Sequence, residues 1–186
     1  MVFGRVAMAG TNGLDFWTKL LDLPGFVVVN AQEDGADNRY RFTVIPQHPI
    51  GVCPHCGKAS DTIKQRRNRE GIMDLPIGSR AVELSVRVGQ FDCGNCGQCF
   101  TPPIEFLAEG SHATERFLER AAELIRHSDV ANAARFFRVP EKTLERWYYE
   151  YVERRQQQAA ETSTGKIRRI GIDELSLKKS TGSSSP

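Results

Sequence analysis

Apolar residues recur at helical spacing near the start of the chain. Leu14, Trp17 and Leu21 stand three and four residues apart, with Leu20 beside them, and a Pro-Gly pair follows. This pattern predicts a short amphipathic helix that ends before residue 24. Residues 1–13 have no such period, and we expect them to form a loose leader.

The period then changes from helical to alternating. The segments 27–33 and 39–45 flank the turn-forming sequence DGADN, and Tyr40, Phe42 and Val44 alternate with polar neighbours. Two such segments on either side of a turn predict a β-hairpin. The sequence AVELSVRVGQF at 81–91 alternates in the same way and predicts a further strand.

Helical spacing returns from residue 111 to about 155. One apolar stripe contains Phe117, Ala121, Leu124 and Ile125, and a shorter apolar element lies at 130–137. The last stripe contains Leu144, Trp147, Tyr148, Tyr151 and Val152. This spacing predicts three helices, with Trp147 buried between them. Residues 156–168 are polar and read as a linker, and RIGIDELSL, from Arg169, predicts one more strand before a Ser-rich tail that we expect to be disordered.

Composition is ordinary, but charge is unevenly placed. The chain has 186 residues, with 25 basic and 23 acidic side chains and a net charge of only +2. Local basic clusters are therefore more informative than the total. The stretch IKQRRNR at 63–69 carries Lys64, Arg66, Arg67 and Arg69 without an acid. No apolar run approaches the roughly 18–20 residues that a membrane span requires, and we expect a cytoplasmic protein without a membrane partner.

The cysteines form two pairs that point to metal binding. Cys53 and Cys56 make one C-x-x-C, Cys93 and Cys96 make another, and 36 residues separate the pairs. Four thiolates can surround one zinc ion tetrahedrally, and because they leave no position for water the zinc would be structural. A thioredoxin-like redox pair is the alternative, but it requires a C-x-x-C that opens a helix. Cys99 could replace Cys93 or Cys96 as a ligand.

The segment ANAARFFRVPEKTLERW at 131–147 has the pattern of a helix-turn-helix. Ala134 and Phe137 precede a turn, Val139 follows it, and Pro140 suits the start of a second helix. Ser128 is the expected N-cap of the first helix of this motif. The outward face of the second helix would carry the candidate DNA-contacting residues Lys142, Thr143, Glu145, Arg146 and Tyr149. The alternative is an ordinary three-helix bundle with solvated charges.

These elements predict an α+β fold in several parts. A short helix and hairpin at 14–50 lead into a small strand-rich zinc-binding domain at 51–110. An all-helical helix-turn-helix domain at 111–155 follows, and the linker 156–168 leads to an orphan C-terminal strand and tail at 169–186.

The order of motifs resembles the ISL-three family of insertion-sequence transposases. It is carried by LLDLPGFVVV, CPHCG, the block DLPIGSRAVELSVRVGQFDCGNCGQCFTPP, the helix-turn-helix and IGIDELSLKK. The resemblance implies that the four paired cysteines bind zinc and that the helix-turn-helix binds the inverted repeats at the ends of a mobile element. It also implies that Asp173 is the first of three acids that hold catalytic Mg²⁺ in an RNase H-like domain of a full-length relative.

The resemblance stops at the first catalytic acid. After Asp173 only Glu174 remains, and neighbouring strand residues point to opposite faces of a sheet. We therefore expect a truncated, nucleoid-associated bacterial transposase part that binds DNA without cutting it, with itself or a full-length transposase as a further partner. A stand-alone repressor of transposition and a protein-binding zinc module are the alternatives.

Overall fold

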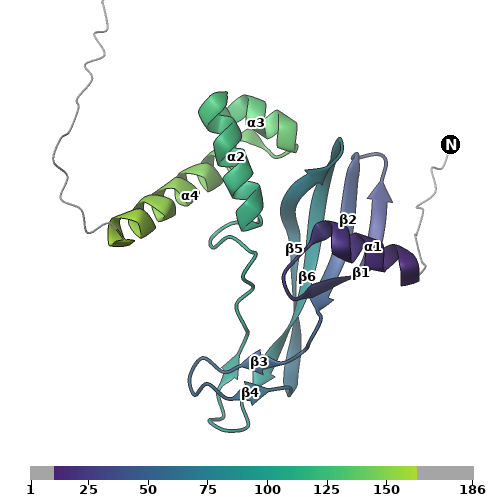
Figure 1. Ribbon diagram of the computed structural model, residues 1–186, viewed down its shortest axis with the longest axis vertical. Helices are drawn as coiled ribbons and strands as arrows, with labels where there is room; N and C mark the ends of the chain where they lie inside the picture. Colours follow the sequence, from purple (N-terminus) through teal and green to yellow (C-terminus); the bar gives the residue numbers. More distant parts are fainter. Residues whose placement is uncertain (1–10, 163–186) are drawn as a thin grey trace, which may run out of the picture.

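The computed structural model describes residues 11–162 (Figure 1). Its helices are α1 (Thr11–Leu21), α2 (Glu115–His127), α3 (Val130–Phe137) and α4 (Glu141–Thr162). Its strands are β1 (Phe26–Asp34), β2 (Arg39–Pro46), β3 (Gly51–Val52), β4 (Ala59–Ser60), β5 (Ile63–Ile77), β6 (Arg80–Asp92) and β7 (Cys99–Phe100). The strand expected from Arg169 and the candidate acid Asp173 lie outside the described residues.

The central sheet has the order β1-β2-β6-β5, and β7 pairs with the end of β6. The expected hairpin is confirmed as the antiparallel pair β1–β2, and β2 then runs parallel to β6 over Arg39–Val44 and Ala81–Val86. Strands from both sides of the boundary expected at residue 50 therefore belong to one sheet. The parallel pairing is possible because the segment that contains β3, β4 and β5 returns the chain to the same end of the sheet before β6 begins. The 13 residues of β6 then pair with β2 near the start of the strand and with β7 at its end.

One face of the sheet packs under α1 (Figure 1). Alternate side chains of β6, including Val82, Leu84 and Val86, are fully buried there with Phe42 of β2. The Trp17 ring lies 5.1 Å from that of Phe42, measured between centroids. The apolar face of α1 differs in one position from the prediction, since Leu21 is buried and Leu20 is exposed.

The three later helices form a bundle at one end of the sheet (Figure 1). As predicted, Trp147 is buried, with 4% of its surface exposed, and it packs with Phe117 and Leu144. Two local predictions are wrong. Asp129, not Ser128, caps α3, because its carboxylate accepts the amide of Asn132 at 2.7 Å. Residues 156–162 also continue α4 instead of starting a linker.

A buried carboxylate joins the sheet to the bundle. Asp74 of β5 is fully buried and accepts hydrogen bonds from Thr114 Oγ1 at 2.7 Å and Arg116 Nε at 2.8 Å. Arg116 also donates to the carbonyl of Leu21 at the end of α1, at 2.7 Å. The same Thr114 hydroxyl caps α2 by accepting the amide of Phe117. One network thus connects β5, α1 and the first turn of α2.

Replacing Asp74 by Ala should strongly destabilise the protein. Arg116 and Thr114 would keep their polar groups without the carboxylate, and breaking one side of a buried ion pair costs about 3–5 kcal/mol. Denaturant unfolding, with zinc content checked, would measure this loss. The matched control is Glu123→Ala, which breaks the exposed ion pair with Arg120 and should cost less than about 1 kcal/mol. Similar losses in both variants would contradict the central role of Asp74.

Candidate metal centre and DNA-binding helices

The paired cysteines occupy two loops of the same shape. Cys53 and Cys56 lie between β3 and β4, and Cys93 and Cys96 lie between β6 and β7. In the first loop the amide of Gly57 donates to the Cys53 carbonyl at 2.8 Å, and in the second the amide of Gly97 donates to the Cys93 carbonyl at the same distance. Both glycines have φ near +70°, a conformation that glycine adopts without steric cost. The C-x-x-C-G sequences therefore fold into matching turns that face each other.

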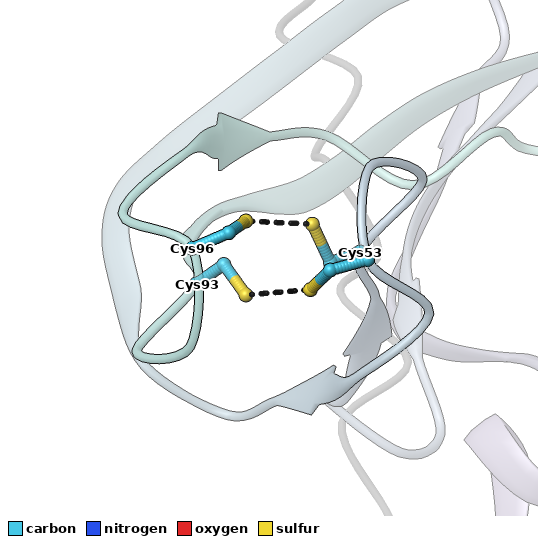
Figure 2. Close-up of side chains that lie close together, drawn as sticks. Cys53, Cys93 and Cys96 are labelled. Carbon is cyan, nitrogen blue, oxygen red and sulfur yellow. Dashed lines mark hydrogen bonds between the residues drawn. The ribbon is translucent and has the colours of Figure 1, made fainter.

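The four sulfur atoms form a cluster that fits a tetrahedral metal ion. They all lie within 4.8 Å of one another, with 3.7 Å between the Sγ atoms of Cys53 and Cys96 and 3.5 Å between those of Cys56 and Cys93. A tetrahedron with Zn–S bonds of about 2.3 Å has edges of about 3.8 Å. Figure 2 shows side chains of the two loops directed toward each other. All four thiols are free, and four such ligands fill the coordination sphere, as in a structural site.

Backbone amides of the second loop favour a thiolate. The N–H groups of Cys96 and then Asn95 donate to the Cys93 sulfur and lower its pKa to about 6. At Cys96 the N–H of Gln98 acts in the same direction, but burial and the neighbouring thiols of Cys93, Cys53 and Cys56 outweigh it and raise the pKa to about 12. Metal binding requires all four groups as thiolates, and a divalent cation would supply the charge that the loops lack.

Cys99 does not join the cluster. Its exposed thiol donates to Asp92 Oδ1 at 2.7 Å and accepts a hydrogen bond from Lys64 Nζ at 3.0 Å. The alternative ligand sets that used Cys99 therefore have no geometric support. His55 is also exposed and is not part of the cluster.

The packing beneath the cluster was not foreseen from the sequence. Phe91 and Phe100 stack with centroids 5.7 Å apart under Cys53 and Cys93. Gly51 lies against them, since a Cβ at this position would stand 2.8 Å from the Phe100 ring. Phenylalanines that flank a C-x-x-C at both ends, as in FDCGNCGQCF, are the signal that could have identified this support.

The helix-turn-helix is formed by α3 and α4. Arg138 ends α3 in the left-handed conformation with φ 56°, where glycine is more usual, and the amide of Val139 donates to the Ala134 carbonyl at 3.1 Å. The Pro140 carbonyl then accepts the amides of Thr143 and Leu144, which starts α4. The turn therefore fixes the angle between the two helices.

The candidate DNA-contacting residues share one side of α4. Lys142, Glu145, Arg146 and Tyr149 are exposed, and Thr143 is half-buried. They lie opposite Leu144, Trp147 and Tyr151, which are buried in the bundle. The other candidates, Lys64, Arg66, Arg67 and Arg69, are exposed on a different element, the edge strand β5. The structure thus places the candidates in two separate groups, one on α4 and one on β5.

The fold and the cluster define a zinc-ribbon and helix-turn-helix protein. Residues 102–152 match the family model described as the helix-turn-helix domain of transposase family ISL3. Residues 50–96 match that of the zinc-finger of transposase IS204/IS1001/IS1096/IS1165. Together the two matched segments correspond to the N-terminal region of an ISL3-family transposase.

A curated relative agrees with this assignment. The transposase for insertion sequence element IS1001 from Bordetella parapertussis is 26% identical over 137 residues, which cover 72% of this chain and 32% of that protein. The match therefore spans about a third of the relative's length. No solved structure matches the chain. Within residues 11–162, none of the helices has the length and apolar character needed to cross a bilayer.

Replacing Cys53 by Ser should remove the metal, because a hydroxyl is a far weaker zinc ligand than a thiolate and only three thiols remain in the cluster. Mass spectrometry of the native protein should find one zinc per chain in the wild type and none in the variant, together with lower thermal stability. Cys99→Ser is the matched control and should keep one zinc. Equal zinc content in all three proteins would rule out the four-thiol site.

Proposed function

We propose that this chain is the DNA-binding part of an insertion-sequence transposase and that it binds the terminal inverted repeats of a mobile element during DNA transposition. The observation that carries the proposal is the exposed side of α4, where Lys142 and Arg146 lie one turn apart on a helix whose other side is anchored by Trp147. The match to the transposase helix-turn-helix model supports it. Bacterial cytoplasm, on nucleoid DNA, is the corresponding location.

In this proposal α4 lies in the major groove. The second helix of a helix-turn-helix reads base edges with its N-terminal residues, and the candidates occupy the first nine residues of α4, which begins at Glu141. Arg146 can donate two parallel hydrogen bonds to a guanine edge, and Glu145 can accept from the amino group of cytosine. Lys142, Thr143 and Tyr149 would contact phosphates or neighbouring bases, which sets the register of the helix.

The cysteine cluster has a supporting role in this proposal. One zinc ion held by Cys53, Cys56, Cys93 and Cys96 would tie the β3–β4 loop to the β6–β7 loop. Four thiolates leave no position for water, so the metal would stabilise the fold and take no part in chemistry. Catalytic Mg²⁺, with the residue matched by Asp173 as its first ligand, is proposed only for a full-length relative, and association with such a transposase or with a second copy of this chain is proposed as well.

Replacing Arg146 by Ala should weaken binding to an inverted-repeat duplex by about ten- to a hundredfold, since a bidentate arginine–guanine contact is worth about 1–3 kcal/mol. Preference over random DNA should fall in parallel. Lys142→Ala should weaken binding to the inverted-repeat duplex and to random DNA about equally, and it should lower the slope of affinity against salt concentration by about one. Fluorescence anisotropy with the repeats that flank the coding sequence would measure these changes.

The matched control for this experiment is Arg120→Ala, which also removes one exposed positive charge from the bundle but lies on α2. It should bind as the wild type does. If Arg146→Ala and Lys142→Ala also bind DNA like the wild type, the exposed side of α4 is not a DNA-reading surface. Protein binding would then be the better interpretation.

A further inference from the structure

Part of the β5–β6 hairpin extends beyond the paired sheet as a two-stranded ribbon. β2 accompanies β6 only as far as Val86, whereas β5 continues to pair with β6 up to Phe91. We call Gln65–Arg69 together with Val86–Gln90 the basic ribbon. On β5 every residue from Ile63 to Glu70 is exposed. No neighbouring element of the described structure therefore covers this part of β5.

Positive charge is concentrated on the ribbon and is mostly unpaired. It carries Arg66, Arg67 and Arg69 on β5 and Arg87 on β6. Within the described residues, Arg66, Arg69 and Arg87 have no carboxylate within ion-pair distance, and Arg67 bonds only the neutral Gln90. Arginines elsewhere on the sheet are neutralised, as Arg39 is by Glu83 at 2.8 Å. The ribbon is thus a local excess of charge in a chain whose net charge is only +2.

The register places guanidinium groups on both faces. Arg66 pairs with Gly89 and Asn68 with Arg87, so Arg66 and Arg87 share one face. Ser85 donates to the Asn68 side chain at 3.1 Å on that same face. Arg67 pairs with Val88 and Arg69 with Val86, which places these two arginines on the opposite face. A ribbon with positive charge on both faces can contact the two phosphate backbones of a duplex at the same time.

Charge on an edge strand has another common purpose, because it prevents edge-to-edge aggregation. That purpose explains a charge on β5 but not Arg87, which projects from the face of β6. It also does not require arginines on both faces. The two-sided arrangement matches a DNA groove better, since the major groove, about 12 Å wide, admits a two-stranded ribbon between its phosphate rows.

We propose that the basic ribbon is a second DNA-binding element, which lies in a groove of the duplex outside the segment that α4 occupies; this inference rests on the proposed function. The bundle is attached to β5 at Met73, whose carbonyl accepts the amide of Thr114. Arg66 is seven residues from Met73 along β5, or about 23 Å at roughly 3.3 Å per residue. The ribbon is thus displaced along β5 from the point where the bundle is attached, and we expect a duplex that contacts both elements to be longer than the α4 site alone, by a part of the helical turn of about 34 Å.

The experiment compares duplex lengths with the full chain in its zinc-bound form. Binding is measured on a long duplex of about three turns and on a short one of about one turn centred on the α4 site. The double variant Arg66→Ala/Arg87→Ala should bind the long duplex about tenfold more weakly than the wild type. The slope of its affinity against salt concentration should fall by about two, because two phosphate contacts are lost. Its affinity for the short duplex should match the wild type.

The controls separate this inference from the proposed function. Lys19→Ala/Arg120→Ala removes two exposed positive charges that lie on α1 and α2, and it should bind both duplexes as the wild type does. Arg66→Gln/Arg87→Gln keeps polar side chains on the ribbon, so a loss in this variant as well excludes aggregation as the cause. Wild-type affinity of both ribbon variants for the long duplex would overturn the inference. Failure of the wild type to bind either duplex would instead overturn the proposed function.

Discussion

The buried carboxylate of Asp74 is the constraint on which the rest of the architecture depends. It accepts hydrogen bonds from Thr114 and Arg116, and Arg116 in turn holds the end of α1. The hydrogen bonds that Arg116 donates to this carboxylate, and then its negative charge, raise the pKa of Arg116. Taking a carboxylate out of water is unfavourable unless every lone pair finds a donor, so the position of α2 is specified relative to the sheet. The angle of α4 follows, because α3 and α4 pack on α2.

The opposite end of the molecule is held in a different way. Near the cysteine loops the buried cluster contains only Phe91, Phe100 and the cysteines themselves, and so small a cluster buries too little apolar surface to order four loop and strand segments. Thiolate–metal bonds would replace that missing burial. The sheet thus connects an end stabilised by packing and a buried ion pair with an end suited to metal ligation.

The arginines also differ from one element to another in whether an acid pairs with them. On the β1–β2 hairpin and at the junction, arginines are paired with acids, as Arg41 is with Asp34 and Arg116 with Asp74. On α4 and the basic ribbon, by contrast, the described structure shows Arg146, Arg66 and Arg87 without an acidic partner. Paired arginines stabilise the fold, whereas unpaired ones keep their capacity for phosphate and base edges. A near-neutral chain can therefore keep unpaired arginines on two separate surfaces.

The sequence by itself determined the features that depend on neighbouring residues. The three-to-four spacing of Leu144, Trp147 and Tyr151 predicted the buried side of α4, and the C-x-x-C-G repeats predicted two turns with inward thiols. Such features follow from local periodicity and from glycine's freedom at positive φ. The resemblance to ISL-three transposases also came from the order of these motifs.

Only the tertiary structure decided which distant segments meet. The basic stretch from Lys64 to Arg69 has no apolar alternation, and it becomes a strand because β6 supplies its hydrogen bonds. The parallel pairing of β2 with β6 and the exclusion of Cys99 from the cluster are decided in the same way. Asp74 stands in a short loop-like motif, DLPIGSR, that gives no sign of burial. Its role arises because folding brings Thr114 and Arg116, about forty residues later, to the one place where their donors are needed.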